Sequence, residues 1–186
     1  MFSEGEIAAQ LNLSRTPVRE AFVRLEAEEL VRLVPKRGAL VVPVPPQEAE
    51  DVLDIREAME TSAVHRLCRD SGSVTSVVDR LRTAIGEQRE LARAGDVDTF
   101  ARADEAFHRM IVMAAGNTLA TRFYATLTDR QRRMNRQALQ PQRESIDSAV
   151  EEHHELVAYI AAGDPAGFAE TLRTHLDHWH RREGLR

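Results

Sequence analysis

Four side chains in the second part of the chain have the types and the spacing of a metal site. Asp104 and His108 are four residues apart, so on a helix both point to one face, where a carboxylate and an imidazole can share one cation. His153 and His175 lie in two later segments of helical pattern. If these helices pack around one cavity, three imidazoles and a carboxylate converge on a site suited to zinc, nickel, cobalt, iron or manganese. From the spacing alone, an exposed Asp104–His108 pair without a metal is the commoner arrangement, and both interpretations stay open.

These residues must be positioned by a set of packed helices. Apolar residues recur with helical periodicity after residue 46, and Gly, Asn and Pro interrupt the pattern. We expect helices over 47–69, 74–93, 97–115, 118–139, 145–162 and 165–182. The last helix has the clearest start, because Asp164 can cap it and Pro165 fits the first helical position. The sequence therefore predicts an all-α bundle of about six helices.

A second group of residues with chemical potential lies near the N-terminus. Ser14 suits a helix N-cap, because its hydroxyl can accept a backbone N–H of the first turn. A buried stripe is then expected at helical spacing, formed by Val18, Ala21, Phe22 and Leu25. Arg15 and Arg19 lie one turn apart along one edge of this helix, and Thr16 faces outwards. Such an edge can contact DNA, although most arginine pairs on helices simply face solvent.

The neighbouring segments favour DNA binding over a solvated face. Residues 4–13 predict a short helix with a tight connection, so the pair of helices has helix-turn-helix proportions. Residues 30–34 and 39–42 are rich in β-forming residues and flank Pro35-Lys36-Arg37-Gly38, a hairpin turn with two cations. The predicted architecture is therefore predominantly all-α: a winged helix-turn-helix with a small β-hairpin over 1–43, a proline-rich linker over 44–48, and the helical bundle over 49–186.

Composition and charge narrow the functional classes. The chain has no run of about 18 apolar residues and no charged-then-apolar leader, so we expect no membrane span and a cytoplasmic protein. A lone cysteine, Cys68, cannot form an internal disulfide and fits a reducing compartment. The net charge is −5, but residues 1–43 carry six acidic and six basic residues. DNA affinity must then come from local placement of cations and from a dimer, and salt should weaken it.

The N-terminal segments resemble the winged helix-turn-helix of the GntR family of bacterial transcriptional regulators. The resemblance is carried by residues 14–20, Arg24-Leu25-Glu26-Ala27-Glu28, Leu30-Val31 and Pro35-Lys36-Arg37-Gly38-Ala39. It implies that the reading helix and the wing contact operator DNA through Ser14, Arg15, Thr16, Arg19, Lys36, Arg37 and Gly38. Two features depart from the family. Met1 begins almost at the second family helix, so we expect the first one to be missing, and Gly5 stands where members often have a phosphate-binding arginine.

The second part resembles the FCD effector domain of the FadR subfamily. The resemblance is carried by Asp104-Glu105-Ala106-Phe107-His108, Ala115-Gly116-Asn117, Glu152-His153 and Thr174-His175-Leu176. It implies a divalent metal, with zinc the first candidate, held by Asp104, His108, His153 and His175. It also implies that Arg56 faces the pocket and binds a small carboxylate effector that completes the coordination, whereas an exposed i,i+4 pair with Glu60 is the alternative.

These observations together predict a metal-containing transcriptional regulator that is not an enzyme. We expect a repressor that acts as a homodimer on a two-fold symmetric operator and responds to an organic acid. One alternative is a metal-dependent hydrolase with Glu105 or Glu152 as general base. Another is a sensing or dimerisation module that no longer binds DNA, because the first helix of the DNA-binding domain is truncated.

Overall fold

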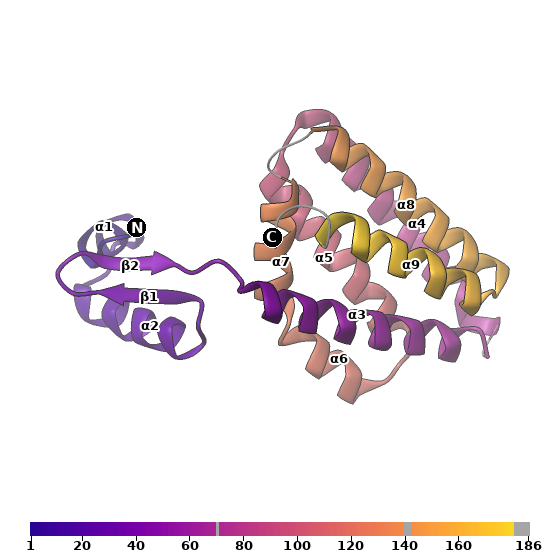
Figure 1. The fold of residues 1–186 in the computed structure, drawn as a ribbon, viewed down its shortest axis with the longest axis horizontal. Helices are drawn as coiled ribbons and strands as arrows, with labels where there is room; N and C mark the ends of the chain where they lie inside the picture. Colours follow the sequence, from indigo (N-terminus) through magenta and orange to yellow (C-terminus); the bar gives the residue numbers. More distant parts are fainter. Residues whose placement is uncertain (70, 140–142, 181–186) are drawn as a thin grey trace. The chain divides into compact units, whose positions relative to one another are not determined.

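The computed structural model describes residues 1–69, 71–139 and 143–180. By the clustering of its contacts the chain forms two compact units, Met1–Val44 and Pro45–Arg186. Figure 1 shows that the first unit combines helices with a hairpin and that the second is built of helices alone. The predicted fold class is therefore confirmed.

The first unit is a small winged helix-turn-helix. Its elements, in chain order, are α1 (Glu4–Leu11), α2 (Arg15–Ala27), β1 (Val31–Val34) and β2 (Gly38–Val41). The two strands pair antiparallel, with Val31 opposite Val41 and Val34 opposite Gly38. The helices bury their apolar faces against this hairpin in a core of Ala8, Val18, Phe22, Val31 and Ala39. This core fixes α2 relative to the hairpin and leaves the opposite edge of α2 exposed.

Helix α2 begins where the sequence predicts, but two details of the prediction are wrong. Ser14 is the N-cap residue, yet its side chain makes no capping hydrogen bond. Ala21, expected in the buried stripe, is exposed, while Val18 and Phe22 are buried and Leu25 is half-buried. A small two-strand hairpin covers only a narrow strip of α2, so the buried stripe is narrower than the helical periodicity suggests.

The turn of the hairpin has a backbone that requires glycine at one position. Gly38 has φ +104°, and a Cβ there would lie 2.1 Å from the Phe2 carbonyl oxygen. Phe2 and Ala39 exchange two backbone hydrogen bonds of 2.8 Å, so the N-terminal residues pair with β2 at this point. Gly38 therefore allows the chain start, the strand and the turn to come together.

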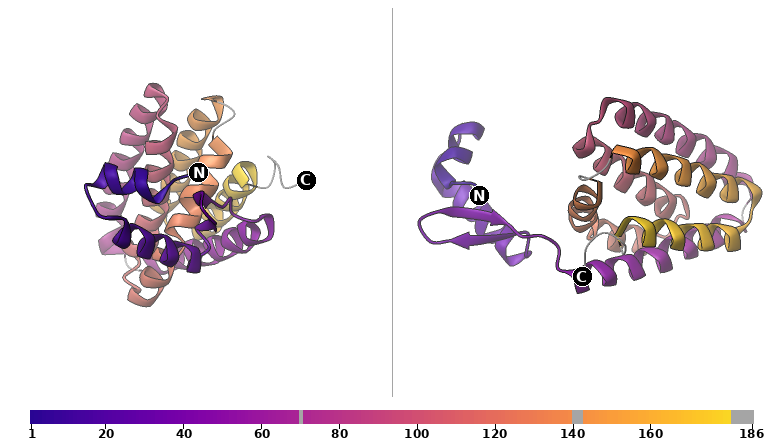
Figure 2. Two further views of the ribbon diagram at one scale, coloured as in Figure 1. Left: turned by 90° about the vertical axis from the view of Figure 1, so that its left-hand side faces the viewer. Right: turned by 45° about the horizontal axis from the view of Figure 1, so that its top comes forward.

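Seven helices build the second unit within the described residues. They are α3 (Pro46–Leu67), α4 (Ser71–Ala94), α5 (Val97–Ala114), α6 (Thr118–Ala125), α7 (Thr128–Leu139), α8 (Arg143–Ala162) and α9 (Pro165–His180). Helix α5 is central, because it contacts α3, α4, α6 and α7. Both views in Figure 2 show α4 beside α8, and α8 in turn packs on α9. None of the described helices has the length and apolar character needed to cross a membrane.

The helix predicted over 118–139 is in fact two helices, and that expectation was wrong. Helix α6 ends at Ala125 and α7 starts at Thr128, with no Gly or Pro between them. The Thr126 hydroxyl donates to the Phe123 carbonyl oxygen at 2.7 Å, and the Thr128 hydroxyl donates to Glu105 at 3.1 Å. These side-chain bonds compete with the helical backbone ladder, so the bend follows from threonine chemistry and from the contact with α5. The bend turns α7 so that it packs against α5.

Candidate metal centre and nucleic-acid interface

The four predicted metal ligands converge in the interior of the helical bundle. Helix α5 supplies Asp104 and His108, α8 supplies His153, and α9 supplies His175. One side-chain ligand atom from each lies within 4.8 Å of the others, and all four residues are buried. The three imidazole rings have centroids 4.9–5.1 Å apart. The exposed arrangement of Asp104 and His108 is therefore excluded.

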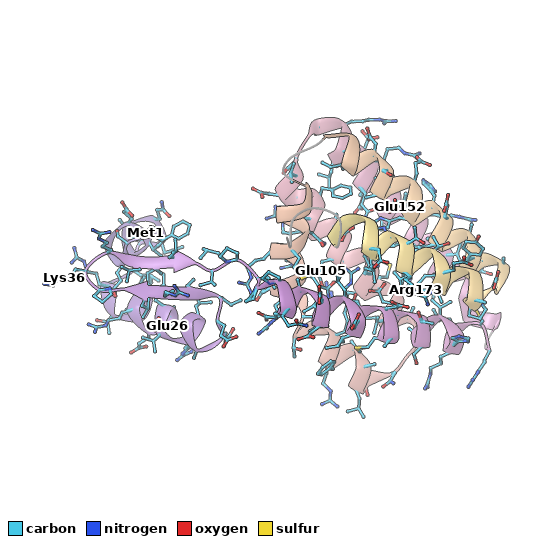
Figure 3. The ribbon with its side chains drawn as sticks, in the orientation of Figure 1. Met1, Glu26, Lys36, Glu105, Glu152 and Arg173 are labelled. Carbon is cyan, nitrogen blue, oxygen red and sulfur yellow. The ribbon has the colours of Figure 1, made fainter. Side chains whose placement is uncertain are left out.

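A protein acceptor faces Nδ1 of each of these imidazoles. For His108 the acceptor is Glu60 Oε2 at 2.7 Å, and for His175 it is Glu152 Oε2 at 2.6 Å. For His153 it is Gln88 Oε1 at 2.8 Å. Because an ionised carboxylate can only accept, Nδ1 carries the proton in the first two rings. Figure 3 labels Glu152 on α8, beside the helix that carries His175.

The amide of Gln88 settles the proton position in the third ring. Gln88 Nε2 donates to the Ala103 carbonyl oxygen at 3.2 Å, so its Oε1 must be the atom that faces His153. Nδ1 of His153 therefore carries the proton and Nε2 holds a lone pair. His153 Nε2 lies 3.3 Å from Asp104 Oδ1, so two acceptor atoms face each other. A cation is the group that makes such a contact favourable.

The orphaned atoms of the cluster fit a metal ion. Among the described residues, Nε2 of His108 and Nε2 of His153 are buried without a hydrogen-bond partner. Asp104 is steadied by Asn135, whose amide nitrogen donates to its Oδ2. Three imidazoles with Nδ1 protonated and one held carboxylate are the donor set that zinc, nickel, cobalt, iron or manganese accepts.

The protonation states at neutral pH suit metal binding. Burial lowers the pKa of His108, His153 and His175, so these imidazoles are neutral and can donate a lone pair. Burial alone would raise the pKa of Asp104, but His153 and His108 outweigh this once they take up protons at low pH, and they hold that pKa well below its usual range. The cluster therefore presents one negative charge and three neutral nitrogen ligands.

Behind His108 lies a buried ion pair that anchors the ring. Glu60 accepts from Arg56 Nε at 3.1 Å and from the Tyr124 hydroxyl at 2.6 Å, while its other oxygen faces His108. Burial would raise the pKa of Glu60, but His108 and Arg56 lower it to about 2. Arg56 is only 1% exposed, so the alternative of an exposed Arg56–Glu60 pair was wrong. Arg56 Nη2 is buried and has no partner among the described residues.

The residues that orient the imidazoles were not predicted from the sequence. Gln88 occupies a core position of α4, in register with Leu81, Ile85 and Ala92, which are buried. Glu60 lies in the same way among the buried residues of α3. A polar residue among the apolar residues of a helix stripe was the sequence signal that could have identified them. Such a residue is expected to be buried, and a buried polar group needs a hydrogen-bond partner.

Neither candidate general base of the hydrolase alternative is free to act as one. Glu152 accepts from His175 Nδ1 at 2.6 Å. Glu105 is fully buried and forms ion pairs with Arg109 and Arg132, both at 3.1 Å, in addition to its bond from Thr128. Both carboxylates hold neighbouring side chains in position, so the geometry gives no support to hydrolysis.

The predicted DNA-contact residues lie together on the surface of the first unit. Arg15, Thr16 and Arg19 are exposed on the first turns of α2, and Ser14 precedes them. Lys36 and Arg37 are exposed in the hairpin turn, and Figure 3 shows Lys36 at the end of the hairpin. Lys36 has φ +63° at the position of this turn that usually takes glycine or asparagine.

A hollow of about 610 Å³ lies between the start of α2 and the hairpin turn. Its lining includes four cations, Arg15, Arg19, Lys36 and Arg37, together with Gly38 and one acidic residue, Glu4. Gly5 also lines it, and a Cβ at Gly5 would lie 3.5 Å from the Arg15 guanidinium. The Arg15 side chain therefore extends over the start of α1, next to Gly5. A concave surface with four cations favours the phosphates of a nucleic acid.

Comparison with protein families gives two matches that cover most of the chain. The FCD domain matches residues 51–178, and the gntR family of bacterial regulatory proteins matches residues 1–41. In solved structures, a putative transcriptional regulator GntR from Rhodococcus sp. RHA1 has a TM-score of 0.78 and 22% identity. The alignment covers 95% of this chain and 83% of that one, and it shows a shared fold.

Two curated relatives extend over both units. An uncharacterised HTH-type transcriptional regulator of Streptomyces ambofaciens is 33% identical over 182 residues, or 94% of this chain and 72% of the relative. A probable D-xylose utilization operon transcriptional repressor of Paenarthrobacter nicotinovorans is 34% identical over 172 residues, or 92% of this chain and 74% of the relative. The matched family and these relatives are transcriptional regulators and not enzymes. The chain belongs to the GntR family of bacterial transcriptional regulators, with an FCD effector domain as its helical unit.

Proposed function

We propose that this protein is a repressor whose helical unit binds a divalent metal and a small organic acid, and that the acid weakens operator binding. One observation carries the proposal. The three imidazoles have Nδ1 occupied by protein acceptors, which leaves Nε2 for a metal, and one ligand atom of each ring lies within 4.8 Å of the others and of an Asp104 oxygen. A site oriented with this much support from neighbouring side chains suits a bound ion.

The metal would be held by Asp104, His108, His153 and His175. Four protein ligands leave positions open on an ion that takes five or six ligands, and zinc would have to expand beyond four; at such a position the metal could bind a carboxylate oxygen of the effector. Arg56 supports this hypothesis, because its buried Nη2 needs an acceptor that the described residues do not supply. A carboxylate between a metal ion and a guanidinium satisfies both.

In our proposal the DNA-binding unit comprises residues 1–43. Its contacts to operator bases and phosphates would come from Arg15, Thr16 and Arg19. Ser14, Lys36, Arg37 and Gly38 would contact the backbone and the adjacent groove. The exposure of these side chains around one concave surface supports this assignment. Residues 44–48 would be the linker, and 49–186 the unit that binds effector and joins two copies. The repressor named for D-xylose utilization, similar over both units, supports the sign of regulation.

The proposed assembly is a cytoplasmic homodimer on a two-fold symmetric operator. Residues 1–43 carry six acidic and six basic residues, so their net charge is zero and one copy has little nonspecific affinity for DNA. Tight binding then needs two linked reading helices. The acid would act by binding more tightly to a dimer whose reading helices do not match the half-site spacing.

The test uses an operator selected from random duplexes by the full chain. Operator binding is then measured by fluorescence anisotropy at rising salt, with metal-loaded protein and with a panel of small carboxylic acids. We expect a steep salt dependence and a shift of the dissociation constant by at least one acid. Binding that shows no salt dependence and ignores every acid would contradict the proposal. A chain that binds metal and acid but no duplex would support the alternative of a sensing module without DNA binding.

A further inference from the structure

Gln131, on α7, is a fully buried polar residue that is not one of the four candidate metal ligands. Its Oε1 lies 3.4 Å from the Tyr124 hydroxyl, and Tyr124 lies 2.6 Å from Glu60 Oε1. Gln131 is thus a member of the polar network that runs from His108 through Glu60 and Tyr124 to α7.

Counting hydrogens shows that one end of the Gln131 amide lacks a partner. Tyr124 has a single proton, and the short contact with the Glu60 carboxylate takes it. Tyr124 therefore has none to donate to Gln131 Oε1, and Gln131 Nε2 has no partner among the described residues. If the amide is turned over, Nε2 donates to the Tyr124 oxygen, and Oε1 takes the position that Nε2 held. In the orientation of the structure a buried polar atom is left unpaired, which costs folding free energy.

Helix α7, which carries Gln131, also contributes a side chain to the proposed metal site. Asn135 follows Gln131 by one helical turn, and its amide donates to the metal-ligand candidate Asp104. Side chains one turn apart on a helix have Cβ atoms roughly 5–6 Å apart. Arg56, whose Nη2 is also unpaired, shares Glu60 Oε1 with Tyr124 in the same network. Two buried side chains with unpaired atoms thus belong to this network.

The geometry points to Gln131 as the residue that recognises a hydroxyl group of the effector. This inference rests on the proposed function, in which the carboxylate of the acid lies between the metal and Arg56. A hydroxyl both donates and accepts, so it pairs with the free end of the Gln131 amide in either orientation, whereas an alkyl group pairs with neither. The preferred effectors are therefore hydroxycarboxylic acids whose hydroxyl lies a few carbons from the carboxylate. A site built around an unpaired polar group discriminates strongly against an analogue that lacks the matching group.

The test compares acids of equal shape on the metal-loaded full chain. The first pair is 4-hydroxybutanoate and pentanoate, and the second is 3-hydroxybutanoate and 3-methylbutanoate; each pair exchanges a hydroxyl for a methyl. Calorimetry on the wild-type protein should show at least one hydroxy acid binding tenfold or more tightly than its methyl partner. Gln131→Leu should reduce that preference to less than twofold and leave the affinity for the methyl acid unchanged. Gln47→Leu, on an exposed position of α3, should keep the wild-type preference.

Metal content and thermal unfolding of each variant separate recognition from structural support. Gln131→Leu should retain the wild-type metal content by elemental analysis, with Gln131→Met as the second variant if the leucine protein does not fold. Equal binding of hydroxy and methyl acids by the wild-type protein, or a preference that survives in both variants, would overturn the inference and leave the proposed function standing. Loss of metal from both variants would also overturn it, because Gln131 would then support the metal site. If no acid of either kind binds the wild-type protein, the effector part of the proposed function fails as well.

Discussion

Gln88 and His153 face each other across the packing of α4 on α8, with 2.8 Å between Gln88 Oε1 and His153 Nδ1. The other end of the Gln88 amide donates to the Ala103 carbonyl oxygen on α5, so the amide cannot turn over without losing this bond. One glutamine thus ties three helices together and selects the tautomer in which His153 Nε2 is free for a metal. Phe107 stacks on the His153 ring at 4.3 Å and holds its plane.

Gln88→Met should weaken metal binding. The methionine keeps the volume of the side chain but removes the acceptor for His153 Nδ1, so the ring is no longer held in the metal-binding tautomer. We expect metal affinity to fall about 10- to 100-fold, as measured by competition with a chromophoric chelator. Gln47→Met, at an exposed position of α3, is the matched control and should bind metal as the wild-type protein does. An unchanged affinity in Gln88→Met would show that the glutamine does not orient the ligand.

Removal of the metal should lower the stability of the helical unit. A ligand present at 100 times its Kd stabilises the native state by about 2.7 kcal/mol, and for a chain of this size each kcal/mol corresponds to about 2–4 °C in Tm. Thermal unfolding before and after dialysis against a chelator measures the change. His153→Ala should show no difference between the two conditions, while His65→Ala, at an exposed position of α3, should behave as the wild type. A wild-type Tm that does not respond to zinc or to the other candidate ions would contradict metal binding.

The stability of the metal-free protein should fall as the pH drops from 7.5 towards 5.5. Burial lowers the pKa of His108, His153 and His175, so below about pH 6.5 the unfolded chain binds protons that the folded chain does not. The free energy of unfolding then decreases with falling pH by at most about 1.4 kcal/mol per pH unit for each histidine. Above this window the imidazoles are neutral in both states and add no pH dependence. Glu60, with a pKa of about 2, adds a further loss only below about pH 4.5.

Urea unfolding at several pH values measures this dependence. His108→Asn, which cannot take up a proton, should flatten the slope between pH 6.5 and 5.5. His65→Asn, at an exposed position, should leave the slope unchanged. A wild-type stability that is constant across this range would mean that the three imidazoles are protonated equally in both states.

Arg19→Ala should weaken operator binding much more than Arg24→Ala. Both residues are exposed on α2, but Arg19 lines the basic hollow and Arg24 lies in the last turn of the helix. Loss of an arginine that forks onto a base costs about 1–3 kcal/mol and relaxes specificity at that base. Lys36→Ala should instead reduce the slope of log K against log salt by about one, as expected for a phosphate contact. Equal losses for Arg19→Ala and Arg24→Ala would place the reading surface elsewhere on the unit.

Gly38→Ala should disrupt the first unit and leave metal binding intact. The new Cβ would collide with the Phe2 carbonyl oxygen, and alanine is strained at φ +104°. We expect loss of operator binding in gel-shift titration with wild-type metal content. Gly86→Ala is the control, because that position on α4 is open and alanine favours a helix by about 0.5–1 kcal/mol. Full operator binding by Gly38→Ala would show that the Phe2–Ala39 pairing is not required.

Local sequence signals were sufficient for much of the fold, and the family resemblance added the identity of the four clustered residues. Asp164 and Pro165 mark the start of α9: Asp164 Oδ1 accepts from the backbone nitrogens of Ala166 and Gly167 at 3.1 and 3.0 Å. The four-residue spacing of Asp104 and His108 places both on one helix face whatever surrounds the helix. The hairpin follows from β-forming residues on both sides of the segment Pro35-Lys36-Arg37-Gly38. Each of these features depends on residues near one another in the chain.

Other features depend on contacts between distant segments, and only the tertiary structure decided them. Thr126 and Thr128 divide α6 from α7 with no Gly or Pro to mark the break, because one of the two hydroxyls bonds to α5. The burial of Arg56 follows from Glu60 and Tyr124, and Tyr124 lies 64 residues beyond Glu60. The tautomer of each histidine is set by an acceptor on another helix, which periodicity cannot reveal. The sequence thus indicated the four candidate ligands, whereas the packing of the helices determined how each is oriented and charged and which side chains support it.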